Sequence, residues 1–185
     1  ITLEEFKSQL NKIKTLVIEQ HQSLYLDELE SLIIKVNLFG FHFASLDIRQ
    51  NSKIHDAVFK DIYDFYIKSN ESVFPKNYYD LSEQDKFEVL SNVKGALNPD
   101  DFENEITRLT IESIQAIKVI QGNNGELGAN RYIISNNENA LNVMETFALI
   151  RLSDWENPTV DVVPLFESVD DLLNAHNVME QLYTN

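Results

Sequence analysis

The chain has 185 residues, with 15 Lys plus Arg against 30 Asp plus Glu, so its formal net charge is −15. It is 43 % hydrophobic and has no cysteine, which excludes disulfide scaffolds and thiolate-bound zinc or iron–sulfur sites and fits a reducing cytoplasm. The acidity argues against nucleic acid or an anionic membrane surface as a partner, and no apolar run approaches the ~20 residues of a membrane span. The length suits one domain with a sizeable core.

The first part of the chain predicts two helices, a strand and a third helix. Apolar residues at three- and four-residue steps predict helices over Leu3–Val17 and Leu26–Val36. Leu38–Ile48 is instead aromatic or apolar at almost every position, which predicts a strand buried on both faces. His42 lies within that strand and is expected to be a core histidine. A helix follows over Ile54–Phe65.

The middle of the chain predicts helices separated by loops. Ser69–Tyr79 has no clean period and reads as a loop, and it is the only weak candidate for an internal boundary. Ser82 is positioned to cap a short helix. Asn98–Asp101 has the composition of a helix start, and the helix it opens is expected to end at Gly122–Gly125.

The last part alternates strand-like and helix-like segments. Strands are expected over Arg131–Ser135 and Val160–Phe166, and helices over Leu141–Ile150 and Leu172–Leu182. With the first strand this makes three strand-then-helix units, the first followed by additional helices. We therefore predict a helix-rich α/β fold with three parallel strands, of the kind found in a partial (β/α) TIM-type barrel.

Candidate functional residues follow the predicted strands, because the active site of a β/α barrel lies at the C-terminal ends of its strands. These residues are Arg49-Gln50, Ser135-Asn136 and Glu167. An arginine offers a donor fork that matches phosphate or carboxylate, and a carboxylate is a hard oxygen ligand for Mg²⁺ or Mn²⁺. Together they describe half of a site for a small phosphorylated acid.

Each candidate also has a purely structural interpretation. Arg49 could pair with Asp47 or cap the following helix, and Glu167 could be an exposed acid favoured by the positive end of a helix dipole. His55, one turn into its helix, is expected to pack against other helices or face solvent rather than act in catalysis. His21 and His176 fall on helix surfaces, and the spacing of the histidines gives little support to a histidine metal site.

Two motifs and a strand between them resemble phosphoenolpyruvate carboxylase of the bacterial and plant type. FGFHFASLDIRQNS at Phe39–Ser52 resembles the family's Leu-Asp-Ile-Arg-Gln segment, and VVPLFESVDDLLNA at Val162–Ala175 resembles its Pro-Leu-Phe-Glu segment. RYIIS at Arg131–Ser135 falls where the family has a Tyr-x-Ile-Ser strand. The match covers essentially the whole chain and departs at Asn136–Asn139, where the family has a more apolar continuation.

The resemblance implies a function and roles for individual residues. The family joins phosphoenolpyruvate to bicarbonate, giving oxaloacetate and phosphate, with Mg²⁺ or Mn²⁺, on a β/α barrel that assembles as a homotetramer. Arg49 matches an arginine that contacts substrate phosphate or bicarbonate-derived groups, and Glu167 matches one of two metal-binding carboxylates. Gln50 and Asp47 are plausible supports for these two side chains.

The resemblance also implies that residues 1–185 form one internal piece of the carboxylase barrel. The family's catalytic histidine motif, second metal-binding aspartate and glycine-rich loop are not among these residues. We therefore expect the chain to be inactive alone, and its open strand edges to promote self-association. Two alternatives stay open: a non-catalytic helical interaction module, and an acidic binding protein for a basic partner.

Overall fold

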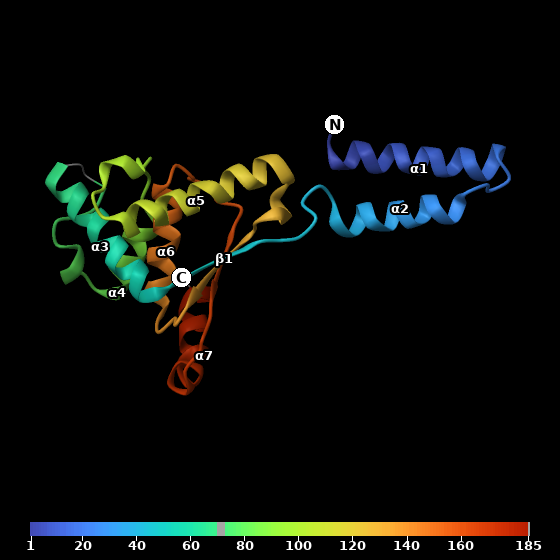
Figure 1. The fold of residues 1–185 in the computed structure, drawn as a ribbon. Coiled ribbons are helices and arrows are strands. Elements are labelled where there is room, and N and C mark those ends of the chain that lie inside the picture. Colours follow the sequence, from blue (N-terminus) through green and yellow to red (C-terminus); the bar gives the residue numbers. More distant parts are fainter. Residues whose placement is uncertain (70–72, 185) are drawn as a thin grey trace.

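The computed structural model describes residues 1–69 and 73–184 and has a helix-rich α/β fold (Figure 1). Within these residues it contains a three-stranded parallel sheet and seven α-helices. None of those helices is both long and apolar enough to cross a membrane. The elements are α1 (Leu3–Gln20), α2 (Leu26–Phe39), β1 (Asp47–Asn51), α3 (Ser52–Ser69), α4 (Glu83–Asn92), α5 (Glu105–Asn124), β2 (Arg131–Ser135), α6 (Ala140–Leu152), β3 (Asp161–Pro164) and α7 (Val169–Thr184), with single 3₁₀ turns at Tyr78–Asp80, Pro99–Asp101 and Glu126–Gly128.

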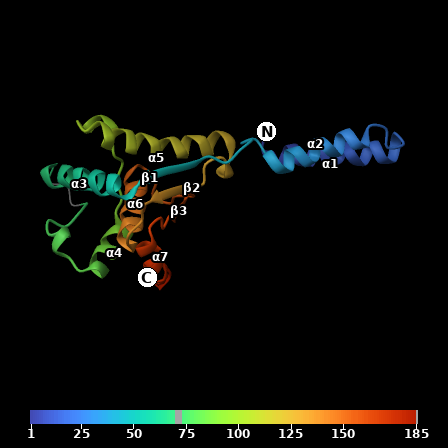
Figure 2. The same ribbon diagram turned by 60° about the horizontal axis from the view of Figure 1, so that its bottom comes forward.

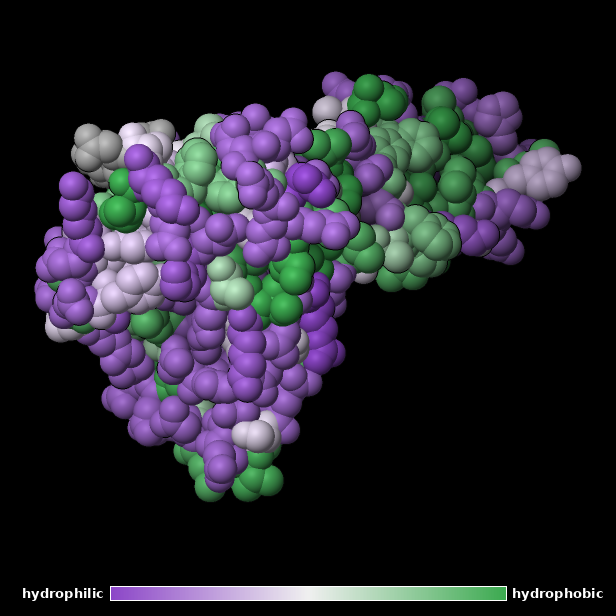
Figure 3. Space-filling view, turned by 60° about the vertical axis from the view of Figure 1, so that its left-hand side comes forward, coloured by the Kyte–Doolittle hydropathy of each residue, from purple (hydrophilic) through white to green (hydrophobic). Residues whose placement is uncertain are grey.

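Helices α1 and α2 form an antiparallel hairpin that projects away from the rest of the chain (Figures 1 and 2). Among the described residues of α1 and α2, only Leu10 and Val36 are buried. Green apolar side chains cover much of the hairpin in Figure 3. Its exposed apolar side chains include Ile13, Leu16, Ile18, Leu32, Ile34 and Leu38.

The predicted strand over Leu38–Ile48 is wrong. Helix α2 continues to Phe39 and stops at Gly40, whose φ of +50° suits glycine. The chain then turns, so the aromatic run forms the connection from the hairpin to the sheet. Phe41 and Phe43 are exposed, and the strand begins only at Asp47.

His42 is half-buried, so the expectation of a core histidine is also wrong. It packs where the connection touches the body of the protein: a Cβ added at Gly128 would lie 3.2 Å from the His42 Cβ. Nearby, the Leu46 N–H donates to the Gly128 carbonyl at 2.9 Å. Gly128 thus allows the connection to lie close to the turn that precedes β2.

The sheet confirms the predicted parallel α/β arrangement, with strand order β1-β2-β3. Arg49 is in register with Ile133, and Ile133 with Val163. Helices α3 to α5 connect β1 to β2, and α6 connects β2 to β3. Helix α3 packs against β1 and α5, while α6 packs against α3, α4 and β3 (Figure 2).

The core lies between helices α3 to α6 and one face of the sheet. Alternate strand residues point to this face, and Tyr132 and Ile134 of β2 are fully buried in it. The opposite face carries charged side chains, among them Arg49 and Arg131. The sheet is therefore covered by helices on one side, whereas its other side carries charged residues together with Ile133 and Val163.

Two predictions for the middle of the chain have different outcomes. Residues 70–72 of the predicted loop Ser69–Tyr79 lie outside the described residues. The predicted helix start at Asn98–Asp101 is a separate 3₁₀ turn, and α5 begins at Glu105 with Asn104 as its N-cap. Phe102 explains the offset, because its backbone is extended and its side chain is only 5 % exposed in the core.

Candidate functional site

Arg49 and Glu167 meet at the carboxyl-terminal edge of the sheet. The Arg49 Nη2 lies 2.7 Å from the Glu167 Oε1, and both side chains are about half exposed, at 54 % and 41 %. The second carboxylate oxygen of Glu167, Oε2, accepts the backbone N–H of Asn136 at 2.8 Å. Arg49 within β1, Asn136 after β2 and Glu167 after β3 thus come together at one carboxylate.

The local sequence explains why Glu167 is free to reach these donors. Ser168 caps helix α7: its Oγ accepts the Asp171 N–H at 3.0 Å, and the Asp171 carboxylate accepts the Ser168 N–H at 3.2 Å. Asp170 and Asp171 are the acids of the first turn, so Glu167 lies just outside the helix. Glu167 is thus exposed at the start of α7, as its structural interpretation expects, but it precedes the first turn of the helix.

Asn136, a candidate residue without a predicted role, begins the loop Asn136–Asn139. Asn136 has a left-handed backbone with φ +54°, and its carbonyl accepts the Ser52 Oγ at 2.6 Å. Asn139 caps α6 by accepting the Asn142 N–H at 3.0 Å. Asparagine directly after a strand was the available signal, because this residue type tolerates positive φ and caps helices.

Arg49 is the third residue of β1 rather than the residue after it. It does not pair with Asp47 either, because the Asp47 carboxylate accepts the Arg131 Nε at 2.8 Å. Gln50 uses its Oε1 to accept the Asn51 N–H at 2.9 Å. The structure thus brings together Arg49, Glu167 and Asn136, whereas the side chains of Gln50 and Asp47 contact other residues.

The residues described here do not form a complete site for Mg²⁺ or Mn²⁺. No cluster of three or more His, Asp or Glu side chains suited to a metal ion occurs in residues 1–69 and 73–184. Glu167 offers one carboxylate, and both of its oxygens already have donors. Since Mg²⁺ requires about six oxygen ligands in a near-octahedral arrangement, Glu167 can supply only part of a coordination shell.

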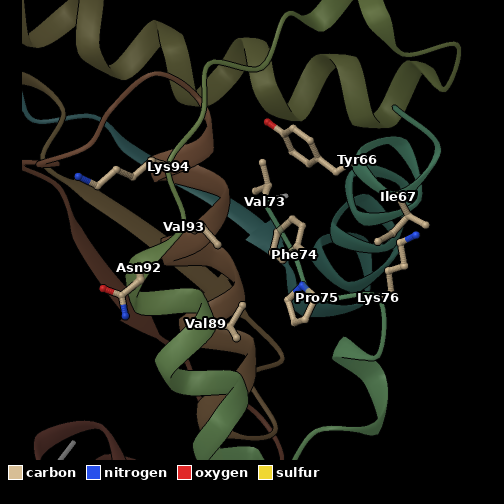
Figure 4. Close-up of a pocket in the computed structure, with 10 residues that line it drawn as sticks. All are labelled: Tyr66, Ile67, Val73, Phe74, Pro75, Lys76, Val89, Asn92, Val93 and Lys94. Atoms are coloured by element: carbon tan, nitrogen blue, oxygen red, sulfur yellow. The ribbon is translucent and has the colours of Figure 1, made fainter. Parts of the chain in front are cut away.

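A cavity of about 730 Å³ lies between the end of α3 and helix α4, and it is separate from the Arg49–Glu167 contact. Figure 4 shows Phe74, Val89 and Val93 around this space, which is mainly apolar. The Lys94 side chain points away from it and pairs with Glu156. Lys94 therefore does not direct its charge into the cavity, and Lys76 is the other charged residue among the described residues of the lining.

Two buried titratable side chains lie among the helices. The His55 ring is fully buried, with its Nε2 3.0 Å from the Tyr132 hydroxyl and its Nδ1 3.0 Å from the Thr146 Oγ1. Burial lowers the pKa of His55 to about 4. This confirms the expected packing role. Glu145, 7 % exposed, accepts the Tyr78 hydroxyl at 3.2 Å, and burial raises the pKa of Glu145 to about 7.

Comparison with known proteins identifies the family. The family model for phosphoenolpyruvate carboxylase matches residues 1–185. The phosphoenolpyruvate carboxylase of Nitrosomonas eutropha is 32 % identical over 180 residues, which cover 90 % of this chain and 19 % of that protein. That of Prochlorococcus marinus is 32 % identical over 191 residues, 98 % of this chain and 18 % of that protein. That of Gloeobacter violaceus is 35 % identical over 165 residues, 84 % and 17 % respectively. The chain, which spans less than a fifth of the length of these relatives, belongs to the phosphoenolpyruvate carboxylase family.

Proposed function

We propose that this chain is part of a cytoplasmic phosphoenolpyruvate carboxylase, which forms oxaloacetate and phosphate from phosphoenolpyruvate and bicarbonate. The observation that carries the proposal is the 2.7 Å contact between Arg49 and Glu167. These residues belong to two motifs that are 118 positions apart in the sequence, yet their side chains meet at one edge of the sheet. The reaction is inferred from membership of the family, and the Arg49–Glu167 contact is the proposed position of part of the active site.

In this proposal Arg49 binds an anionic group of the substrates. Its planar guanidinium can donate two parallel hydrogen bonds to a phosphate or carboxylate, and its charge stabilises negative charge that develops during the reaction. Glu167 contributes one carboxylate to Mg²⁺ or Mn²⁺, with the other ligands coming from outside the described residues. The ion pair keeps both charges neutralised while no substrate is bound.

The sheet is proposed to be part of a β/α barrel. Purely parallel sheets normally have both faces covered, whereas here helices cover one face, and the other carries two ion pairs with Ile133 and Val163. That pattern supports a sheet whose second face lines the inside of a barrel, with additional strands at its two edges. Uncovered edges in the isolated chain are expected to cause self-association, and the complete enzyme is proposed to be a homotetramer.

The isolated chain is expected to be inactive, because it offers one metal-binding carboxylate and spans 19 % of the Nitrosomonas eutropha enzyme. The measurement combines the 185-residue chain with phosphoenolpyruvate, bicarbonate and Mg²⁺ or Mn²⁺ and follows oxaloacetate. A full-length carboxylase is the positive control and heat-treated chain the blank. Oxaloacetate formation above the blank by this chain alone would show that the expectation is wrong.

A further inference from the structure

We infer that Asn136 is a positioning residue for Glu167, because the left-handed backbone at Asn136 directs its N–H at the carboxylate. The inference rests on the proposed role of Glu167. The contact itself is direct: the Asn136 nitrogen lies 2.8 Å from the Glu167 Oε2. A role in orientation was not apparent from the sequence, because Asn136 falls where this chain departs from the family pattern.

Hydrogen bonds hold the backbone around Asn136 in place. The Ser52 Oγ donates to the Asn136 carbonyl at 2.6 Å, and Ser52 is only 1 % exposed. The next N–H, that of Asn137, donates to the Leu165 carbonyl at 3.1 Å. Leu165 lies two residues before Glu167, so the loop is joined to the Glu167 segment by two hydrogen bonds. The peptide between Asn136 and Asn137 is therefore held by Ser52 at the start of α3 and by Leu165 just after β3, and the backbone conformation of Asn136 sets its N–H relative to that peptide.

The backbone conformation at position 136 restricts which residue types fit there. Its φ of +54° lies in the left-handed region, which asparagine and glycine adopt readily and β-branched residues avoid. The Asn136 side chain itself donates to Glu138 at 3.1 Å and is not the group that contacts Glu167. Position 136 is thus expected to tolerate glycine but not residues that disfavour the left-handed conformation.

The two donors to Glu167 differ in a way that gives Asn136 its role. Arg49 is a flexible side chain, 54 % exposed, and can leave the carboxylate when a substrate anion competes for it. The Asn136 N–H is fixed by the fold and stays. Asn136 therefore keeps Glu167 oriented while Arg49 binds substrate, in the way that outer hydrogen bonds orient metal-binding side chains.

Three variants test this inference. Asn136→Val should disturb the left-handed backbone, Asn136→Gly should preserve it, and Gln22→Val introduces the same strain at φ +51° in the exposed α1–α2 turn. In a full-length carboxylase that carries this segment, we expect Asn136→Val to lower kcat about 10- to 100-fold. Asn136→Gly should restore it to within about threefold of the parent, because glycine adopts positive φ freely. Gln22→Val should retain the parent kcat.

Nuclear magnetic resonance on the 185-residue chain gives a readout that does not depend on activity. The amide proton of residue 136 is expected downfield in the parent and in Asn136→Gly, and upfield in Asn136→Val and in Glu167→Gln. If Asn136→Val does not fold, Asn136→Ala takes its place. Equal kcat for parent and Asn136→Val, or a residue 136 amide that does not respond to Glu167→Gln, would overturn the inference. Full activity of Glu167→Gln alone would instead contradict the proposed function.

Discussion

Arg49→Lys and Glu167→Gln are each expected to lower the carboxylation rate of a full-length enzyme carrying this segment by about 100- to 1000-fold. Lysine keeps the positive charge of Arg49 but loses the planar fork that can bind an anion through two hydrogen bonds. Glutamine keeps the shape of Glu167 but loses the charge that a divalent cation requires. The measurement is the steady-state rate of oxaloacetate formation at saturating substrate and metal.

Arg131→Lys is the matched control for Arg49→Lys. Arg131 pairs with Asp47 at 2.8 Å at the other end of the same strands, and its side chain has a similar exposure of 49 %. Since exposed ion pairs contribute about 0–1 kcal/mol to stability, neither Arg→Lys change should unfold the protein. We expect Arg131→Lys to retain the parent rate. Near-normal rates for Arg49→Lys or Glu167→Gln would remove that residue from the site.

Glu145→Gln is expected to stabilise the chain above pH 7. Burial, followed by the nearby charge of Asp56, raises the pKa of Glu145 from 4.5 to about 7, although Tyr78 donates to it and Lys86 lies close. The folded state then binds the Glu145 proton more tightly than the unfolded state does, so stability falls as pH rises from 4.5 to about 7. Such a shift corresponds to about 3 kcal/mol at most. Glutamine can still accept the Tyr78 hydroxyl and has no charge to bury.

Urea unfolding at several pH values measures this effect. The free energy of unfolding of Glu145→Gln should exceed that of the parent by about 1–3 kcal/mol at pH ~8 and nearly equal it at pH ~4.5. His55 also changes the stability of the parent with pH: because its pKa is lowered from 6.5 to about 4, the free energy of unfolding falls as the pH drops below 6.5. Between pH 4.5 and 6.5 the effects of Glu145 and His55 oppose each other, so the free energy of unfolding of the parent should change little there. That of Glu145→Gln should follow His55 and fall as the pH drops.

The exposed acid Glu112 on α5 provides the control, since Glu112→Gln removes one charge without changing a buried group. Its free energy of unfolding should stay within about 0.5 kcal/mol of the parent at every pH. A Glu145→Gln variant that is less stable than the parent at pH ~8 would show that the ionised carboxylate is stabilised rather than penalised in the fold.

The sequence predicted the parallel sheet and most helices because their signals are local. Arg131–Ser135 is a short apolar run and Leu141, Met144, Phe147 and Ile150 recur at helical spacing, and the strand and helix lie where these residues indicate. Apolar composition misled the prediction at Leu38–Ile48. A short apolar run does not by itself specify a strand, and this one forms the end of α2 and a connection in which Phe41 and Phe43 are exposed.

For the site, the residue types could be predicted from the sequence, whereas the contacts between residues far apart in the sequence could not. The types of Arg49 and Glu167 suggested anion and cation chemistry, whereas their direct contact depends on strand register and on the cap that places Glu167 before α7. The Asn136 contribution could not be predicted, because the group that acts is a backbone N–H whose direction depends on φ. Residue types in a sequence describe side chains, and they do not show in which direction a backbone N–H points.

The pairing of β1 with β2 has a consequence for the order in which the chain folds. Asp47 is in register with Arg131, 84 positions later, while α1 and α2 contact each other across one short turn. During synthesis at roughly 5–20 residues per second, β1 waits on the order of ten seconds for its partner strand, whereas the hairpin can form at once. In that interval the contacts between α1 and α2, which are local in sequence, can form while β1 is still unpaired. The charged residues Asp47 and Arg49 on β1 oppose premature pairing with other chains, because charge on an exposed strand disfavours edge-to-edge association.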